Sequence, residues 1–240
     1  MRVSLRWLRD YVQTDLAPEE LARRLTEAGL EVSDVDYVGH DWGGIFVARV
    51  ASLEPHPRAD RLVVAQAAVG DRRFTLVTGA PNIRAGVNVA LAMPGALVRD
   101  PGTGELTAVS QRSLRGITSE AVLCSERELG ISDDHIGIML LPDDAPVGAS
   151  LAEYLGDTIL DCEVTPNRPD WLSMLGIAWE VGAVSGQRVS PPDLSYPEAG
   201  PPITDSVSVE IRHPDLGLRY TAALVRGVTI APSPYWLRQR

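Results

Sequence analysis

The chain has 240 residues, of which 45% are hydrophobic and 22% are charged, a composition typical of a globular protein with a buried core. The formal net charge of −10 opposes non-specific attraction to polyanions. All 22 cationic residues are arginine. The absence of lysine excludes every site that depends on one, such as a P-loop or a Schiff base.

Two further features bound the class of protein. No apolar run approaches the roughly 20 residues that a membrane helix needs, and the first residues have no signal-peptide core. Cys124 and Cys162 are far apart and form no CxxC pair, which predicts two reduced thiols rather than a disulfide or a metal site. We therefore expect a cytoplasmic protein without membrane contact.

The first 40 residues predict two helices and a strand. Ser4 is a common N-cap residue, and apolar residues follow it at helical spacing. A second helix is expected to begin at Pro18, with acidic residues in its first turn, and to stop at Gly29. Residues 31–38 read as a strand.

The sequence pattern changes between residues 45 and 150, where short β-rich runs alternate with Gly- and Pro-containing turns. This spacing predicts a small closed barrel rather than a parallel sheet. A short helix is expected at Ser125-Glu-Arg-Glu128, which has the spacing of a capping box. The expected strands cover residues 45–53, 62–68, 74–78, 87–93 and 117–124.

After residue 150 the sequence again predicts both a strand and a helix. Leu160, Cys162 and Val164 alternate as one face of a strand. A helix is expected to open at residues 167–170, capped by Asn167 or Asp170, and to run to about residue 184. Its predicted inner stripe consists of Leu172, Leu175, Ala178 and Trp179.

The last 50 residues read as a linker followed by the beginning of another domain. Residues 191–205 are rich in Pro and Gly. Residues 207–211 and 220–225 have the composition of strands. A helix start is expected after Pro232-Ser-Pro234, and the end of the chain at Arg240 reads as a truncation.

Five separated motifs in the barrel region resemble a tRNA-binding domain. That domain is shared by phenylalanyl-tRNA synthetase β subunits, some methionyl-tRNA synthetases and free-standing tRNA-binding proteins, and the resemblance implies an OB fold. The motifs are His56-Pro-Arg-Ala-Asp60, Val77-Thr-Gly79-Ala-Pro81-Asn82-Ile-Arg84, Ala92-Met-Pro94-Gly95, Leu114-Arg115-Gly116-Ile-Thr-Ser119-Glu120 and Cys124-Ser125-Glu-Arg-Glu128.

The flanks of the barrel resemble the start of the bacterial phenylalanyl-tRNA synthetase β subunit. The matching runs are Met1-Arg-Val-Ser-Leu-Arg-Trp7, Leu25-Thr-Glu-Ala-Gly29 and Glu163-Val-Thr-Pro166-Asn-Arg-Pro-Asp170. The resemblance implies an α+β multidomain protein: a small, helix-rich α+β domain with an inserted five-stranded OB-fold β-barrel, then the start of a further α+β domain. Residues 1–40 plus 151–190 would form the discontinuous first domain, 41–150 the inserted barrel, 191–205 the linker and 206–240 the truncated start of an editing-type domain.

The function implied is that of the amino-terminal part of a phenylalanine–tRNA ligase β subunit. In that family the β subunit binds tRNA(Phe) and supports an (αβ)2 heterotetramer, whose α subunit uses ATP and Mg²⁺ for charging. We expect no cofactor and no catalytic residue within this fragment. The run His135-Ile-Gly-Ile138 is not a class I ATP signature, because its fourth residue differs and its lysine partner is absent.

Candidate site residues follow from the motifs. As tRNA-binding residues we expect Asn82, Arg84, Arg112 and Arg115, because an amide or a guanidinium on a barrel loop can meet a base edge or a phosphate. A structural role is expected for His56, Asp60, Ser125, Glu128, Asn167 and Asp170.

Two other kinds of protein remain open. A free-standing tRNA-binding protein, commonly a dimer, would lack the two flanks. A scaffold whose barrel binds protein is compatible with the charge of residues 41–150, which carry 10 arginines and 13 acids. It is also compatible with the aromatic content, since Phe46 and Phe74 are the only aromatic side chains in residues 45–150 on which nucleobases could stack.

Overall fold

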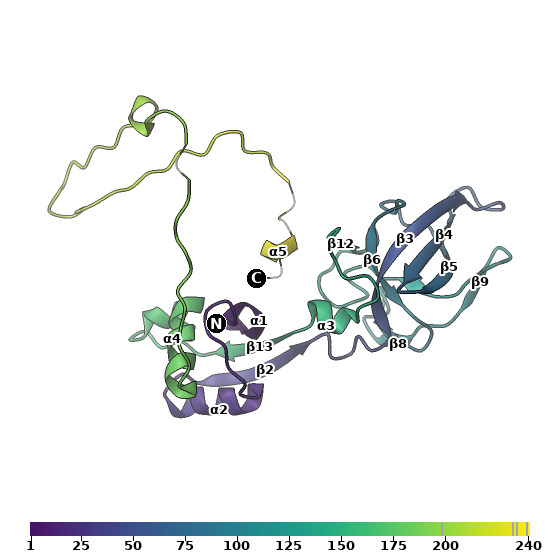
Figure 1. Ribbon diagram of the computed structural model, residues 1–240, viewed down its shortest axis with the longest axis horizontal. Coiled ribbons are helices and arrows are strands. Elements are labelled where there is room, and N and C mark those ends of the chain that lie inside the picture. Colours follow the sequence, from purple (N-terminus) through teal and green to yellow (C-terminus); the bar gives the residue numbers. More distant parts are fainter. Residues whose placement is uncertain (198, 232, 234, 239) are drawn as a thin grey trace. The chain divides into compact units, whose positions relative to one another are not determined.

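The computed structural model of the protein describes residues 1–197, 199–231, 233, 235–238 and 240. It comprises two units, one of Met1–Pro191 with Arg240 and one of Pro192–Gln239. The first unit contains a three-stranded sheet with helices packed on it and a separate, strongly curled β-sheet (Figure 1). The chain is therefore α+β, as predicted.

The three-stranded sheet joins residues from both sides of the curled sheet. Its strands are β1 (Arg2–Ser4), β13 (Asp157–Cys162) and β2 (Val32–Val38), in the antiparallel order β1-β13-β2. Val3 lies opposite Leu160, and Val38 lies opposite Asp157. The central strand of this sheet is therefore supplied by residues that follow the curled sheet in sequence.

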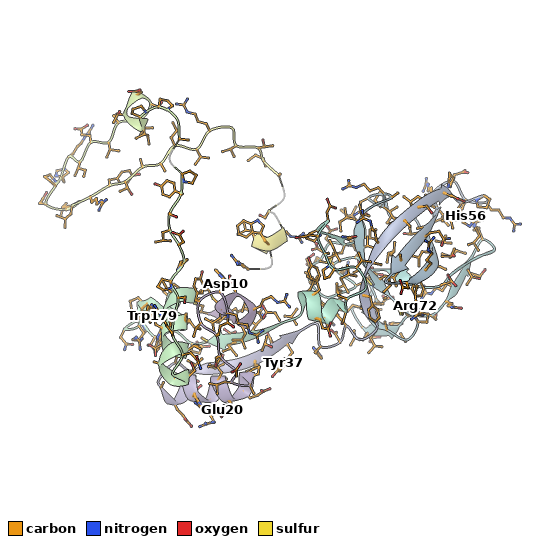
Figure 2. All side chains as sticks on the ribbon, viewed as in Figure 1. Asp10, Glu20, Tyr37, His56, Arg72 and Trp179 are labelled. Atoms are coloured by element: carbon orange, nitrogen blue, oxygen red, sulfur yellow. The ribbon has the colours of Figure 1, made fainter. Side chains whose placement is uncertain are left out.

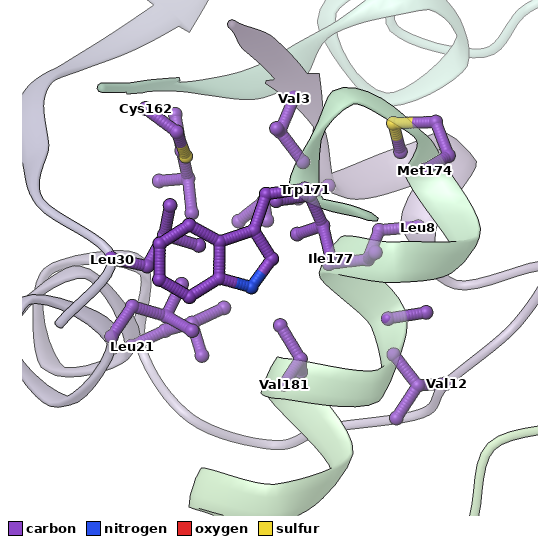
Figure 3. Close-up of a cluster of buried hydrophobic side chains, with 14 of the residues drawn as sticks. Val3, Leu8, Val12, Leu21, Leu30, Cys162, Trp171, Met174, Ile177 and Val181 are labelled. Atoms are coloured by element: carbon purple, nitrogen blue, oxygen red, sulfur yellow. The ribbon is translucent and has the colours of Figure 1, made fainter. Parts of the chain in front are cut away.

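Helices cover one face of this sheet and enclose a hydrophobic core (Figure 3). Trp171, Leu21 and Ile177 are almost fully buried in it. The elements are α1 (Leu5–Leu8), α2 (Pro18–Glu27), the 3₁₀ turn η1 (Pro169–Leu172) and α4 (Met174–Ser185).

The expected beginnings of the first two helices and the expected end of the second are confirmed, whereas the first helix ends at Leu8, before Val12. The Ser4 hydroxyl accepts a hydrogen bond from the Trp7 backbone N–H at 2.9 Å. Pro18 occupies the first turn of α2, and Gly29 follows the helix with φ +101°. Glycine adopts this backbone conformation at little cost, so the chain can turn there into the buried Leu30.

The prediction for the helix after residue 167 was wrong in its start and in most of its buried face. The 3₁₀ turn ends at Leu172, Ser173 is extended, and α4 begins only at Met174. The N-cap is Ser173, whose hydroxyl accepts from the Gly176 N–H at 3.0 Å. The late start shifts the helical phase, so that Met174, Ile177, Ala178 and Val181 are buried.

The predicted stripe is correspondingly displaced. Of its four members only Ala178 is fully buried, and Leu175 packs at the margin of the core. Leu172 and Trp179 are 66% and 54% exposed. Trp171, one residue before Leu172, takes the core position, because the 3₁₀ turn points its indole inward (Figure 3).

The curled sheet is a five-stranded antiparallel half-barrel of the OB type, with strand order β11-β6-β3-β4-β5. A register shift between Val50 and Ser52 bends β3, so that its first half pairs with β6 and its second half pairs only with β4. Two residues of β12 (Leu140–Leu141) also pair with β6. The strands are β3 (Ile45–Pro55), β4 (Val63–Val69), β5 (Arg72–Thr78), β6 (Asn88–Ala92) and β11 (Val122–Leu123).

Two short hairpins form separate two-stranded sheets. One pairs β7 (Leu97–Arg99) with β8 (Leu106–Ala108), and the other pairs β9 (Arg112–Leu114) with β10 (Ile117–Ser119). The strand expected over residues 117–124 is thus two strands. The first, β10, pairs with β9, and the second, β11, pairs with β6. Between β10 and β11 the Glu120 N–H donates to the Thr75 carbonyl at 2.9 Å.

The helix expected at residues 125–128 does not form, although its capping hydrogen bonds do. Ser125 N–H donates to Glu128 Oε2 at 2.7 Å, and Glu128 N–H donates to Ser125 Oγ at 3.3 Å. The chain makes only turns there and reverses at Gly130, where φ is +70°. The helix of this part of the chain is instead α3 (Leu151–Leu155).

Specific polar contacts hold the segments that precede and follow the curled sheet. The Trp42 indole donates to the Leu129 carbonyl at 3.0 Å. The Arg6 guanidinium donates to the carbonyl oxygens of Glu153, Tyr154 and Gly156. These carbonyls belong to α3 and its end, so Arg6 places a cation where the helix dipole is negative.

In the second unit the described residues include only short elements, η2 (Ile203–Asp205) and α5 (Tyr235–Arg238). The strands expected at residues 207–211 and 220–225 do not form: these segments have no ladder partner, and most of their side chains are exposed. A strand without a paired edge or a buried face has nothing to offset its loss of conformational entropy. Pro232 and Pro234 lie outside the described residues, and α5 follows them.

Candidate nucleic-acid interface

His56 connects two turns at one end of the half-barrel. The side chain is 5% exposed and lies in the turn between β3 and β4 (Figure 2). Its Nδ1 accepts from the Arg58 backbone N–H at 3.1 Å, and its Nε2 lies 3.1 Å from the Leu114 carbonyl oxygen. Because a backbone N–H can only donate, Nδ1 carries no proton and Nε2 donates to Leu114. The imidazole therefore fixes the β3–β4 turn to the β9–β10 hairpin.

The hairpin turn consists of Arg115 and Gly116, both with positive φ, at +52° and +90°. Such a two-residue turn matches the twist of paired strands but favours Asn-Gly or Gly-Gly. Among the residues that the structure describes, Arg115 is the one non-glycine with positive φ. A Cβ on Gly116 would lie 3.1 Å from Arg58 Nη1, so the Arg58 guanidinium packs against this turn.

A small cavity of about 180 Å³ lies beside the same hairpin. Arg112 and Ser110 line it together with Thr78 at the end of β5. Buried Ser119 ties the hairpin to β5, since its hydroxyl accepts from the Val77 N–H at 3.1 Å and donates to the Ala121 carbonyl at 3.0 Å. The hairpin is thus held by side chains at both of its strands.

Asn82 has a structural role that the sequence did not reveal. Its Nδ2 donates to the Ile138 carbonyl at 2.8 Å, and its Oδ1 accepts from the Ile138 N–H at 3.0 Å. A Cβ on Gly137 would lie 2.4 Å from that Oδ1, so glycine is required for the close approach. The amide is therefore occupied by the backbone, whereas Arg84, two residues later, is exposed.

The three candidate arginines, together with Arg58, have no ion-pair partner in the described part of the chain. Arg58, Arg84, Arg112 and Arg115 are exposed, and none forms an ion pair with the described part of the chain. Asp60 is exposed in the same turn as Arg58. A guanidinium without a local partner can meet a phosphate with its planar set of donors.

Aromatic rings contribute little to this surface. Phe74 is buried and lies under the Arg72 guanidinium, whose carbon is 5.0 Å from the ring centroid. Phe46 is partly buried against the barrel core. OB folds usually bind single-stranded nucleic acids by stacking bases on aromatic side chains. The barrel of this chain offers no freely exposed Phe, Tyr or Trp ring for such stacking.

The motif at residues 167–170 also has a structural role, but not as a helix cap. Asn167 is exposed, and Asp170 pairs with Arg168 at 2.8 Å. Arg168 also pairs with Glu180 on α4. The hydrogen bond from Arg168 holds the pKa of Asp170 below its ordinary value. Sequence reasoning missed this arrangement, although an Arg-x-x-Trp run before a helix with an outward Glu was a usable signal.

The two cysteines are free and buried. Burial raises the pKa of Cys162 to about 11 and raises that of Cys124 as well, so neither is a reactive thiolate at neutral pH. Within the described ranges, no group of three or more His, Cys, Asp or Glu side chains could hold a metal ion. No helix in the described part of the chain is long and apolar enough to cross a membrane.

The half-barrel region is similar to a known family of domains. Residues 45–150 match the family described as "Putative tRNA binding domain". A crystal structure of a MetRS-related protein from Pyrococcus horikoshii aligns with 45% of this chain and 87% of that one, with 19% identity and a TM-score of 0.33.

The whole chain is more specifically similar to one kind of synthetase subunit. It is 43% identical over 240 residues to the phenylalanine–tRNA ligase β subunit of Dehalococcoides mccartyi, and 45% identical over 242 residues to that of Syntrophus aciditrophicus. Each alignment covers 100% of this chain and 30% of the relative. The chain is thus a homologue of phenylalanine–tRNA ligase β subunits over about a third of their length, which confirms the resemblance seen in the motifs.

Proposed function

We propose that this chain is the amino-terminal region of a phenylalanine–tRNA ligase β subunit, which binds tRNA(Phe) and supports charging by an α subunit. The assembly would be a cytoplasmic (αβ)2 heterotetramer that uses ATP and Mg²⁺ outside this region. The proposal is supported by the similarity of the whole chain to such subunits, flanks included. The flanks also argue against a free-standing tRNA-binding protein, which would need only the barrel.

The division into domains is part of the same proposal. Residues 1–40 and 151–190 act as one domain interrupted by the barrel of residues 41–150, and residues 191–205 link it to the start of an editing-type domain at 206–240. The antiparallel pairing of β13 with both β1 and β2 supports this division. Residues 41–150 expressed alone should fold cooperatively with a β-rich far-UV spectrum, whereas a helix-dominated spectrum would contradict the division.

One observation supports the RNA-binding role most directly. A loop and a hairpin of the barrel bear exposed arginines that have no carboxylate partner in the described part of the chain. These arginines are Arg84, Arg112 and Arg115. In a chain with net charge −10, binding should be weak, with a Kd of about micromolar or higher. If these three side chains each neutralise one phosphate, log K should fall with log salt at a slope of roughly −2 to −3.

A gel shift of tRNA(Phe) with the 240-residue chain, with and without the α subunit, tests this role. Arg84→Ala and Arg115→Ala should each weaken binding and flatten the salt slope by about one unit. Arg23→Ala is the control, because Arg23 is paired with Glu20 and Glu27 on α2. Undetectable binding at low salt would contradict the role.

A protein-binding barrel is the second candidate, and one observation favours it. Ile136 is 80% exposed and Ile131 is 40% exposed in the loop that follows the 125–130 turn. Exposed apolar side chains on a loop are typical of protein contacts. If the α subunit protects residues 131–137 from proteolysis and tRNA does not, the barrel is a protein-contacting module.

A further inference from the structure

The His56 bridge brings together arginines that are separate in the sequence. The Arg58 N–H and the Leu114 carbonyl bond to opposite sides of the same buried imidazole. Arg58 is thereby held beside Gly116, and Arg115 precedes that glycine. Arg112 lies in the same hairpin. We call Arg58, Arg112 and Arg115 the turn cluster.

Without a bound anion, repulsion among its arginines makes the turn cluster electrostatically unfavourable. Like charges on adjoining turns repel each other, and none of the three has an ion-pair partner in the described part of the chain. Two acids share its surroundings. Asp60 lies in the same turn, and the pKa of Asp100 is lowered by backbone N–H groups of Thr103 and Gly102, with a smaller effect of Arg112. Neither forms a salt bridge with the cluster.

The backbone at Arg115 adds a second cost. A positive φ is unfavourable for a residue with a long side chain, and Asn or Gly would fit this turn better. Strain of this kind persists where the surrounding structure over-determines it. Here the His56 and Ser119 hydrogen bonds do so, and they hold the hairpin whose turn contains exposed Arg115.

We propose that the turn cluster is a binding surface for the phosphate backbone of RNA, in which Arg58 acts together with Arg112 and Arg115 and His56 is a positioning residue. This rests on the proposed RNA-binding role of the barrel and assigns it to one end of the barrel. Phosphate is the ligand that fits, because three exposed arginines without an ion-pair partner in the described part of the chain belong to two adjoining turns, and the barrel has no exposed Phe, Tyr or Trp ring for stacking. A bound phosphodiester would also remove the repulsion among the arginines.

Binding of a folded tRNA transcript to the 240-residue chain, followed by fluorescence anisotropy over a salt series, tests the arginines. Arg58→Ala and Arg115→Ala should each weaken binding roughly fivefold at low salt and flatten the log–log salt slope by about one unit. The matched control is Arg188→Ala, since Arg188 is exposed and lies outside the barrel. It should leave both quantities unchanged.

His56 is tested by a variant that removes no arginine. His56→Ala should weaken binding about as much as Arg58→Ala, and Arg58→Ala made in that background should cost less than about twofold more, because the cluster is already dispersed. His56→Asn, which keeps an acceptor for the Arg58 N–H, should retain part of the affinity. Circular dichroism and thermal unfolding of each variant separate loss of positioning from loss of folding.

The possible results separate this proposal from the broader one. If Arg84→Ala weakens tRNA binding and Arg58→Ala does not, the turn cluster is overturned while the RNA-binding role of the barrel stands. If additive losses for His56→Ala and Arg58→Ala are found, His56 does not position the cluster. If no tRNA binds at low salt, both proposals are overturned.

Discussion

The guanidinium carbon of Arg168 lies 3.7 Å from the centroid of the Trp171 ring. The same guanidinium pairs with Asp170 and with Glu180, so one side chain covers the core indole and holds the 3₁₀ turn against α4. This stacked, forked geometry is specific to arginine.

Arg168→Lys should therefore be nearly as harmful as Arg168→Ala. We expect both variants to lower the Tm by several degrees, because a lysine keeps the charge but loses the fork and the stacking. Arg23→Ala, which removes two exposed ion pairs on α2, should change the Tm far less. A Tm for Arg168→Lys equal to that of the parent chain would contradict the assigned role.

The pairing of Asp170 predicts a dependence of stability on pH. Its pKa is lower in the folded state than in the unfolded chain, so its contribution is present above the unfolded pKa and is lost as the pH falls through the folded one. The difference in Tm between the parent chain and Asp170→Asn should consequently be largest near neutral pH and should shrink in acid. A difference that stays constant from pH 7 to pH 3 would be inconsistent with this linkage.

Gly176 is required by the break between the 3₁₀ turn and α4. A Cβ at this position would lie 1.9 Å from the Asp170 carbonyl oxygen, which is backbone and cannot move aside alone. Gly176→Ala should destabilise the protein by about 3 kcal/mol or more, although alanine normally favours a helix. Gly43→Ala is the control, because a Cβ there meets nothing within 4 Å. Urea unfolding of both variants measures the difference.

Trp171 and Trp179 should behave oppositely on truncation. Trp171 is 2% exposed in the core, whereas Trp179 is 54% exposed on the outer face of α4 (Figure 2). Trp171→Ala should cost about 3–5 kcal/mol through the cavity it leaves, and Trp179→Ala should cost less than about 1 kcal/mol. Equal losses in urea unfolding would mean that the predicted stripe, not the observed one, faces the core.

Asn82 and Arg84 should separate stability from binding. Asn82→Ala leaves the Ile138 N–H and carbonyl without their partners, which should cost about 1–3 kcal/mol. Arg84→Ala should leave stability unchanged and weaken tRNA binding. If Asn82→Ala weakens binding at full stability, the amide contacts RNA directly.

Several helix ends, the β-rich region and the family resemblance could be predicted from the sequence, because each depends on residues that lie close together in the chain. Ser4 and Pro18 mark helix starts through hydrogen bonding and a fixed φ, and Gly29 permits a positive φ where the helix ends. The short β-rich runs between glycine and proline turns predicted a small closed barrel, and the structure has a curled half-barrel of the OB type there. Its motifs, together with the flanks, indicated the synthetase β subunit, since they are spread over about residues 1–190.

Tertiary structure decided what depends on contacts between distant residues. The phase of α4 follows from the 3₁₀ turn at Pro169, which selects Trp171 over Trp179 for the core. The capping box at Ser125 forms without a helix because the chain reverses at Gly130. Asn82 bonds to Ile138, 56 residues away, and His56 bonds to Leu114, 58 residues away. No local pattern records such partners, because they exist only once the strands between them have closed the sheet.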